Sequence, residues 1–122
     1  MAVVRIVADL EAARPAEVAA FYQQVFGLET AMDQGFFVTL AGRGAGQRVQ
    51  LSLASAGGSG TPVPALSIEV DDLADTMARA AALGVEPEYG PVDEPWGVRR
   101  FFLRDPAGHL INVLTHAPEG AD

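Results

Sequence analysis

The sequence has 122 residues, 49% of them hydrophobic, and no cysteine. That is enough apolar chain for one core, and it excludes disulfides, thiolate metal sites and cysteine nucleophiles. The formal net charge of −8 argues against nucleic acid as a partner, because phosphate contacts need clustered Lys and Arg. Charge interrupts the N-terminus too early for a signal peptide, and no apolar run reaches the roughly 20 residues that span a bilayer. We therefore expect a soluble, cytoplasmic protein without a membrane partner.

The first half of the chain predicts a strand followed by an amphipathic helix. The strand is expected over 3–8 and the helix over about 15–26. Apolar side chains at i, i+3, i+4 and i+7 predict one face of that helix: Val18, Phe21, Tyr22 and Val25. Gly27 is expected to end the helix, because glycine tolerates the positive φ of this position. Extended segments are expected over 36–40 and 49–53.

A Gly-, Ser- and Pro-rich stretch over 55–64 predicts a linker. The second half then repeats the same plan, with a strand over 65–70 and a helix over about 73–83. Asp72 is a natural N-cap for this helix, and Gly84 is its expected stop. A shift of 57 residues lays Gly27 on Gly84.

Each half therefore reads as a βαβββ module. Extended segments over 98–104 and 110–115 complete the second half. A doubly wound fold gives a similar coarse pattern, but no glycine-rich phosphate loop follows the first strand. We predict a single α+β domain with modules over 1–54 and 65–117, joined by the linker 55–64.

The stretch over 96–114 predicts a hairpin with a well-defined turn. Asp105 can accept hydrogen bonds at the first turn position, Pro106 presets φ at the second, and Gly108 tolerates positive φ at the fourth. The flanking strands are apolar and β-branched.

Polar residues alternate with apolar ones along three of the predicted strands. One sheet face should therefore pack on the helices, and the other should either meet water or form the floor of a pocket. The polar positions of that second face are Gln50, Ser52, Ser67, Glu69 and Asn112.

Three motifs together resemble the vicinal oxygen chelate superfamily, which includes glyoxalases, extradiol dioxygenases and bleomycin resistance proteins. The 96–114 hairpin, with its tryptophan, paired arginines and DPxG turn, resembles the last hairpin of that superfamily. The 19–28 run resembles its FYxxxxG helix end, and 68–73 resembles its VDD strand exit. The resemblance implies a cup-shaped mixed sheet built from two βαβββ modules, the glyoxalase/bleomycin resistance/dioxygenase fold, commonly as a homodimer.

Catalytic members of that superfamily hold a divalent metal with His, Glu or Gln side chains. The matching positions of this chain are Val7, Gln50, Ala65 and Asn112. Valine and alanine have no donor atoms, and amide oxygens are weak ligands for transition metals. On one extended strand, His109 and His116 would lie about 23 Å apart on opposite faces, so we expect both to face solvent. The resemblance therefore implies the metal-free type, with no cofactor and no catalytic residue.

Aromatic residues favour ligand binding by such a protein. In the pairs Phe36–Phe37 and Phe101–Phe102, one ring should face the helices and the other the cleft. Trp96 is interpreted as either a lid or a dimer contact. An acidic chain suits a cationic ligand, whereas Arg99 and Arg100 suit an anion. The predicted ligand-binding residues are Phe37, Gln50, Ser52, Ser67, Glu69, Trp96, Arg100, Phe102 and Asn112.

The leading hypothesis is a homodimeric protein of the bleomycin resistance type, which confers antibiotic resistance by sequestering a drug or natural product. The main alternative is a lyase, isomerase or dioxygenase on the same fold, with an unrecognised metal site or Glu69 as general base. A third possibility is an accessory subunit whose cleft is vestigial.

Overall fold

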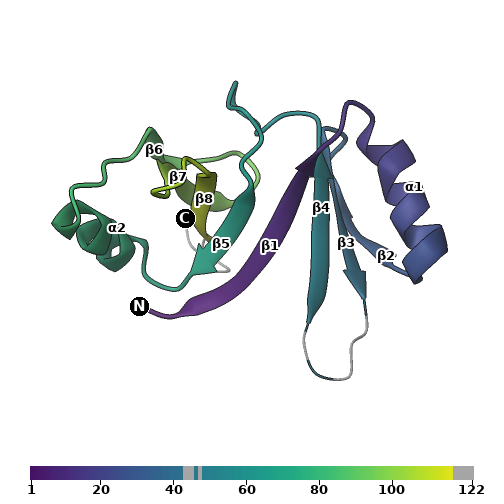
Figure 1. Cartoon of the computed structure of the whole chain (residues 1–122), viewed down its shortest axis with the longest axis horizontal. Coiled ribbons are helices and arrows are strands. Elements are labelled where there is room, and N and C mark those ends of the chain that lie inside the picture. Colours follow the sequence, from purple (N-terminus) through teal and green to yellow (C-terminus); the bar gives the residue numbers. More distant parts are fainter. Residues whose placement is uncertain (43–45, 47, 117–122) are drawn as a thin grey trace. The chain divides into compact units, whose positions relative to one another are not determined.

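The computed structural model of the chain describes residues 1–42, 46 and 48–116. Each half of the chain has the order strand, helix and three strands (Figure 1), so the predicted α+β class is confirmed. The first half contains β1 (Val3–Glu11), α1 (Pro15–Phe26), β2 (Glu29–Asp33), β3 (Phe37–Gly42) and β4 (Val49–Ala54). The second half contains β5 (Leu66–Val70), α2 (Leu73–Ala82), β6 (Tyr89–Asp93), β7 (Val98–Arg104) and β8 (Leu110–His116). Residue 117, the expected end of the second module, lies outside the described residues.

The strand pairings repeat between the two halves. β1 runs parallel to β4, and β4, β3 and β2 follow as antiparallel neighbours. In the same way β5 runs parallel to β8, and β8, β7 and β6 are antiparallel. The outer hairpin of each half even has a register shift, between Thr30 and Met32 in one and between Tyr89 and Val92 in the other. All eight strands belong to one mixed sheet.

The chain divides into two compact units, which we describe separately. The N-terminal unit is Val7–Val63, and the C-terminal unit is Met1–Ile6 together with Pro64–Asp122. None of the described helices is long and apolar enough to cross a membrane.

In the N-terminal unit, α1 packs on one face of the strands. Ala19 lies in a buried cluster with Val38, Leu40 and Leu53, and Gly27 ends the helix with a φ of 69°, as predicted. The following partly buried residues pack against this cluster: Val18, Tyr22, Leu28 and Leu51.

The expected apolar face of α1 is only half correct. Val18 and Tyr22 pack inward, but Phe21 and Val25 are each 57% exposed. The inward face is centred on Ala19, whose small side chain brings the helix close to the sheet, and Phe21 and Val25 fall outside it.

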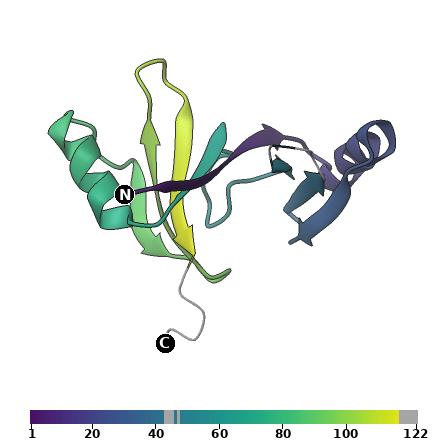
Figure 2. The same ribbon diagram turned by 90° about the horizontal axis from the view of Figure 1, so that it is seen from below.

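In the C-terminal unit, α2 packs on one face of the strands, and Figure 2 shows this helix beside the yellow β7–β8 hairpin. Asp72 caps the helix by accepting a hydrogen bond from the Asp75 N–H at 3.0 Å, as predicted. The buried cluster under α2 consists of Val70, Leu73, Phe101, Ile111 and Val113.

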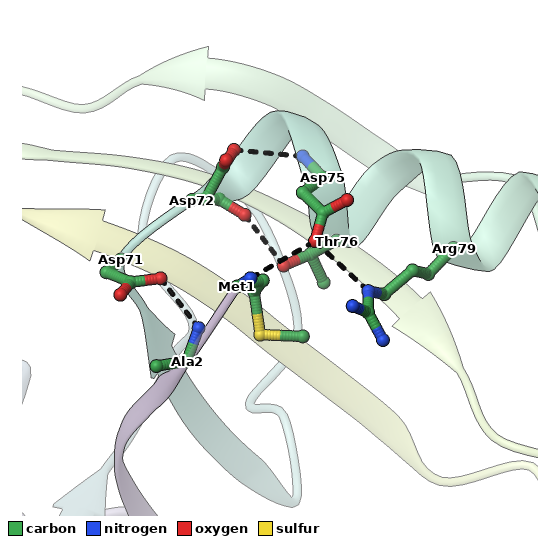
Figure 3. Close-up of polar contacts among 7 residues, drawn as sticks. All are labelled: Met1, Ala2, Asp71, Asp72, Asp75, Thr76 and Arg79. Carbon is green, nitrogen blue, oxygen red and sulfur yellow. Dashed lines mark hydrogen bonds and ion pairs between the residues drawn. The ribbon is translucent and has the colours of Figure 1, made fainter.

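The start of β1 is fastened to the N-terminus of α2 (Figure 3). The Ala2 N–H donates to the Asp71 carboxylate at 2.7 Å, and the Asp71 N–H donates back to the Ala2 carbonyl at 3.1 Å. The Met1 amino group lies 3.3 Å from the Asp75 carboxylate, which also accepts from Arg79 Nε at 3.0 Å. These contacts explain why residues 1–6 belong to the C-terminal unit.

Candidate functional site

The candidate site lies on the face of the C-terminal unit that points away from α2, which we call the far face. It is defined by Ser67, Glu69, Arg100, Phe102 and Asn112. Phe101 and Val113 belong to the cluster under α2, and side chains alternate along a strand, so their neighbours Phe102 and Asn112 point to the far face. The far face thus brings together five of the predicted ligand-binding residues.

The register places these residues in rows across the sheet. Asn112 of β8 is the partner of Ser67 on β5 and of Phe102 on β7, and Phe102 is in turn the partner of Tyr89 on β6. Polar and aromatic side chains therefore meet at Asn112.

A buried ion pair anchors the aromatic end of the far face. Arg100 Nε donates to Glu94 Oε2 at 2.6 Å, and both side chains are 3% exposed. The Tyr89 hydroxyl donates to the same oxygen at 3.1 Å. Buried charges are tolerated when they are paired and hydrogen-bonded, and the charge of Arg100 is neutralised here.

Three aromatic rings surround the Arg100 guanidinium. Its central carbon lies 4.7 Å from the Phe102 ring centroid, 4.9 Å from that of Trp96 and 5.4 Å from that of Tyr89. These distances are within the range of cation–π attraction. Phe102 is only 1% exposed, whereas Trp96 and Tyr89 are partly exposed. The two partly exposed rings are the ones that a ligand would meet first.

The β6–β7 turn sets the position of Trp96. The Glu94 N–H donates to the Val98 carbonyl at 2.7 Å, and the Gly97 N–H donates to the Glu94 carbonyl at 3.1 Å. Gly90 lies within β6 of this hairpin and has a φ of +76°, and a Cβ there would stand 2.5 Å from the Arg100 carbonyl oxygen. Glycine is required at position 90 for both reasons.

Asn112 is the buried polar group at the centre of the row. It is 8% exposed, and its Nδ2 donates to Ser67 Oγ at 3.1 Å. Within the described residues, Asn112 Oδ1 is buried and has no hydrogen-bond partner. An unpaired buried oxygen is uncommon in a native structure and calls for an explanation.

Glu69 lies on β5 in the same row as Arg100, because both residues are strand partners of Leu114 on β8. Its carboxylate accepts from Arg5 Nε at 2.5 Å and lies 3.1 Å from His116 Nδ1. His116 is 48% exposed, so it reaches solvent as expected, but its contact with Glu69 was missed. His109 is 62% exposed and lies 2.8 Å from Asp105 in the β7–β8 turn.

The remaining predicted residues lie on the N-terminal unit. Ser52 is buried and its hydroxyl bonds with that of Thr39 at 2.9 Å. Gln50 is the strand partner of Ala41, and the Phe37 ring packs edge-on against Phe36 at 4.9 Å. Strand alternation places Gln50, Ser52 and Phe37 on the face away from α1.

The family comparison decides the identity of the fold. The model of the Glyoxalase/Bleomycin resistance protein/Dioxygenase superfamily matches residues 3–113. The chain belongs to this superfamily. A search of curated proteins found no match.

Solved structures share the fold at low sequence identity. A superfamily member from Vibrio splendidus 12B01 is 20% identical, with a TM-score of 0.64, and the match covers 94% of this chain and 99% of that one. A methylmalonyl-CoA epimerase from Streptomyces coelicolor, in complex with 2-nitronate-propionyl-CoA, is 19% identical, with a TM-score of 0.69 and coverage of 96% and 97%. A chain described as an NAD-dependent benzaldehyde dehydrogenase from Legionella pneumophila is 15% identical, with a TM-score of 0.72 and coverage of 92% and 99%. These likenesses establish the fold, and one fold supports many activities.

The metal site of the catalytic superfamily members does not fit this chain. At the ligand positions that the family resemblance predicts, Val7 in the N-terminal unit and Ala65 in the C-terminal unit have no donor atoms. Over residues 1–42, 46 and 48–116, no three His, Asp or Glu side chains gather in a way that would hold a metal ion. We therefore derive no chemistry through a metal.

Sequence reasoning missed the partners of three predicted residues. Glu94, Tyr89 and Arg5 were not among the residues predicted from the sequence, although they contact Arg100 and Glu69. The signal for Glu94 was present: a tight turn at Trp96–Gly97 sets Glu94 across from Val98, two residues before Arg100. The partner of Glu69 lies 64 residues away in the sequence and left no local signal.

Proposed function

We propose that this protein binds a small molecule without a metal and without changing it chemically, as a homodimer that sequesters an antibiotic or other natural product. The observation that carries the proposal is the far face, where a row of paired residues runs from the partly exposed Tyr89 through Phe102 to Asn112, a buried amide with an unused acceptor. Aromatic walls with a few placed polar groups are typical of small-molecule sites.

The Arg100–Glu94 pair supports this function by holding the aromatic rings in place. Three rings around one paired guanidinium form a preorganised surface, which lowers the ordering cost of binding. Phe102 forms the buried base of this surface, and Trp96 and Tyr89 offer their partly exposed sides to a planar ligand. Phe37, Gln50 and Ser52 are proposed as further contacts.

Trp96 provides a direct test, because it is the single tryptophan of the chain. Titration with a panel of planar natural products, including bleomycin-type antibiotics, should quench or shift its fluorescence. Recovered ligand should be chemically unchanged by mass spectrometry. Trp96→Ala should weaken binding by about 1–3 kcal/mol, measured by calorimetry.

The control is Phe21→Ala, which removes another exposed aromatic ring from α1 and should leave ligand affinity unchanged. Equal losses in Trp96→Ala and Phe21→Ala would contradict the role of the far face. Conversion of the bound compound would contradict sequestration.

The Glu69–His116 contact favours one alternative, an isomerase or lyase that transfers a proton. A carboxylate 3.1 Å from Nδ1 orients an imidazole and leaves Nε2 as the base. Glu69 would then be a positioning residue, because Arg5 and His116 engage its carboxylate. In this alternative, His116→Gln abolishes solvent-deuterium exchange into a bound substrate and leaves its affinity nearly unchanged. The sequestration proposal expects no such exchange in either protein.

A further inference from the structure

We infer that the ligand group received at Asn112 is a hydrogen-bond donor, an uncharged or cationic N–H or O–H group, and that carboxylates and phosphates are disfavoured there. This inference rests on the proposed function and specifies the chemistry of its ligand. Among the described residues, Asn112 Oδ1 is the one buried side-chain oxygen without a hydrogen-bond partner.

The orientation of the Asn112 amide follows from its neighbours. With Nδ2 donating to Ser67 Oγ at 3.1 Å, one acceptor is left unpaired. In the reversed amide, Oδ1 would accept from the Ser67 hydroxyl, and Nδ2 with its two N–H donors would lie where Oδ1 now has no partner. In the orientation of the structure, Nδ2 is used on Ser67 and the amide presents its acceptor, Oδ1.

An unpaired buried acceptor is paired most simply by a ligand donor. Leaving such a group without a partner is unfavourable, and Asn112 is more than nine-tenths buried. Because the oxygen lies below the surface, the donor group must stand at the end of the ligand, where it can reach in. A primary amide, an amidinium or a phenol hydroxyl has this form.

The charges of the C-terminal unit point in the same direction. Each arginine in the described part of this unit is within ion-pair distance of a carboxylate: Arg5–Glu69, Arg79–Asp75, Arg99–Asp93, Arg100–Glu94 and Arg104–Glu88. An anionic ligand would have to displace one of these partners. Residues 64–116 also contain nine acidic side chains, so the surrounding potential favours a neutral or cationic ligand.

The ion pairs of Arg99 and Arg100 favour a neutral or cationic ligand over the anion that the sequence also allowed. Arg99 and Arg100 suit an anion when only their sequence is considered, but Arg99 lies 3.1 Å from Asp93 and Arg100 is buried against Glu94. The arginines stabilise the hairpin, and Asn112 is left as the group that selects the ligand.

Three probes of nearly equal shape test the inference: benzamide, benzamidinium and benzoate. Each is titrated into 15N-labelled protein, and binding is followed through the Asn112 side-chain amide and the Trp96 indole signals. We expect benzamide and benzamidinium to shift both signals, and we expect benzoate to bind at least about tenfold more weakly than benzamide. Asn112→Leu has a side chain of similar size but no acceptor, and it should lower the affinity for benzamide by about tenfold.

Asn112→Asp keeps an acceptor and adds a negative charge. This variant should bind benzamidinium with unchanged or higher affinity and should bind benzoate more weakly than the unmodified protein does. Gln24→Leu on the exposed side of α1 is the matched amide-to-leucine control. It should leave the affinity for each of the three probes unchanged. The backbone spectrum shows whether each variant is folded.

The outcomes separate the inference from the proposed function. Benzoate binding at the far face as tightly as benzamide, or an unchanged benzamide affinity in folded Asn112→Leu, overturns the inference and leaves small-molecule binding standing. Failure of all three probes, together with failure of the natural-product panel, overturns both.

Discussion

The buried Arg100–Glu94 pair gives the sharpest prediction about stability, because the same hairpin carries an exposed pair for comparison. Arg100 and Glu94 side chains are each 3% exposed, whereas Arg99 and Asp93 side chains are 48% and 79% exposed. Removal of one partner of a buried pair leaves an uncompensated charge and destabilises a protein by about 3–5 kcal/mol. An exposed pair contributes about 0–1 kcal/mol.

We therefore expect Glu94→Ala to lower the free energy of unfolding by about 3–5 kcal/mol and Asp93→Ala to lower it by less than about 1 kcal/mol. Part of the larger loss comes from the Tyr89 hydroxyl, which donates to Glu94 at 3.1 Å. Since a loss of this size approaches the total stability of a small domain, Glu94→Gln is the second variant. It keeps the shape and one acceptor, and its loss should fall between the other two.

The assay is urea denaturation at neutral pH, followed by circular dichroism and by Trp96 fluorescence. The double variant Glu94→Ala/Arg100→Met should recover part of the loss, because it removes the unpaired charge as well. If Glu94→Ala and Asp93→Ala destabilise the protein equally, the buried pair does not anchor the hairpin.

Three further measurements follow from the structure. Hydrogen bonds from the His109 N–H and side chain lower the pKa of Asp105, so its stabilising effect is present above about pH 4 and is lost as the pH falls through the lowered pKa; Asp105→Asn should flatten the acid side of a melting-temperature profile, and an identical slope would be the contrary result. Gly90→Ala should destabilise by about 1–3 kcal/mol, clearly more than Gly35→Ala, where φ is also positive but nothing lies within 4 Å of the added Cβ. Dialysis against EDTA should leave ligand affinity measured by calorimetry unchanged, whereas a loss restored by one metal ion would point to a metal site.

The sequence predicted most reliably the helix ends and turns that depend on residues only a few positions apart. The Asp72 cap of α2 and the Gly27 end of α1 are both confirmed. Asp105 Oδ1 accepts from the Ala107 and His109 N–H groups, and Gly108 has a φ of +89°, as its turn pattern predicts. Such signals lie within a few residues and do not depend on the rest of the fold.

Two strands lacked a readable signal. β2 (Glu29–Asp33) is exposed at every position, so it has no apolar alternation. β6 (Tyr89–Asp93) contains Gly90 and Pro91, which are typical of turns. The pairing of each with an already formed strand, β3 or β7, determines these elements.

The sequence predicted which sheet face carries the candidate site, but it did not predict the contacts of the side chains on that face. Alternation alone placed Ser67 and Asn112 together, and their register confirms that neighbourhood. The state of each polar group depends on partners from other strands: Arg5 reaches Glu69 across the sheet, and Glu94 folds over Arg100. These partners determine which polar groups form hydrogen bonds within the fold. Asn112 Oδ1 has no such partner in the described residues and is proposed to bind a ligand.

Native mass spectrometry of the freshly purified protein tests metal-free sequestration most directly. We expect a dimer without metal that releases an intact neutral or cationic organic molecule carrying an N–H or O–H donor. A stoichiometric metal ion, or a bound molecule that the protein converts on incubation, would contradict sequestration and identify an enzyme.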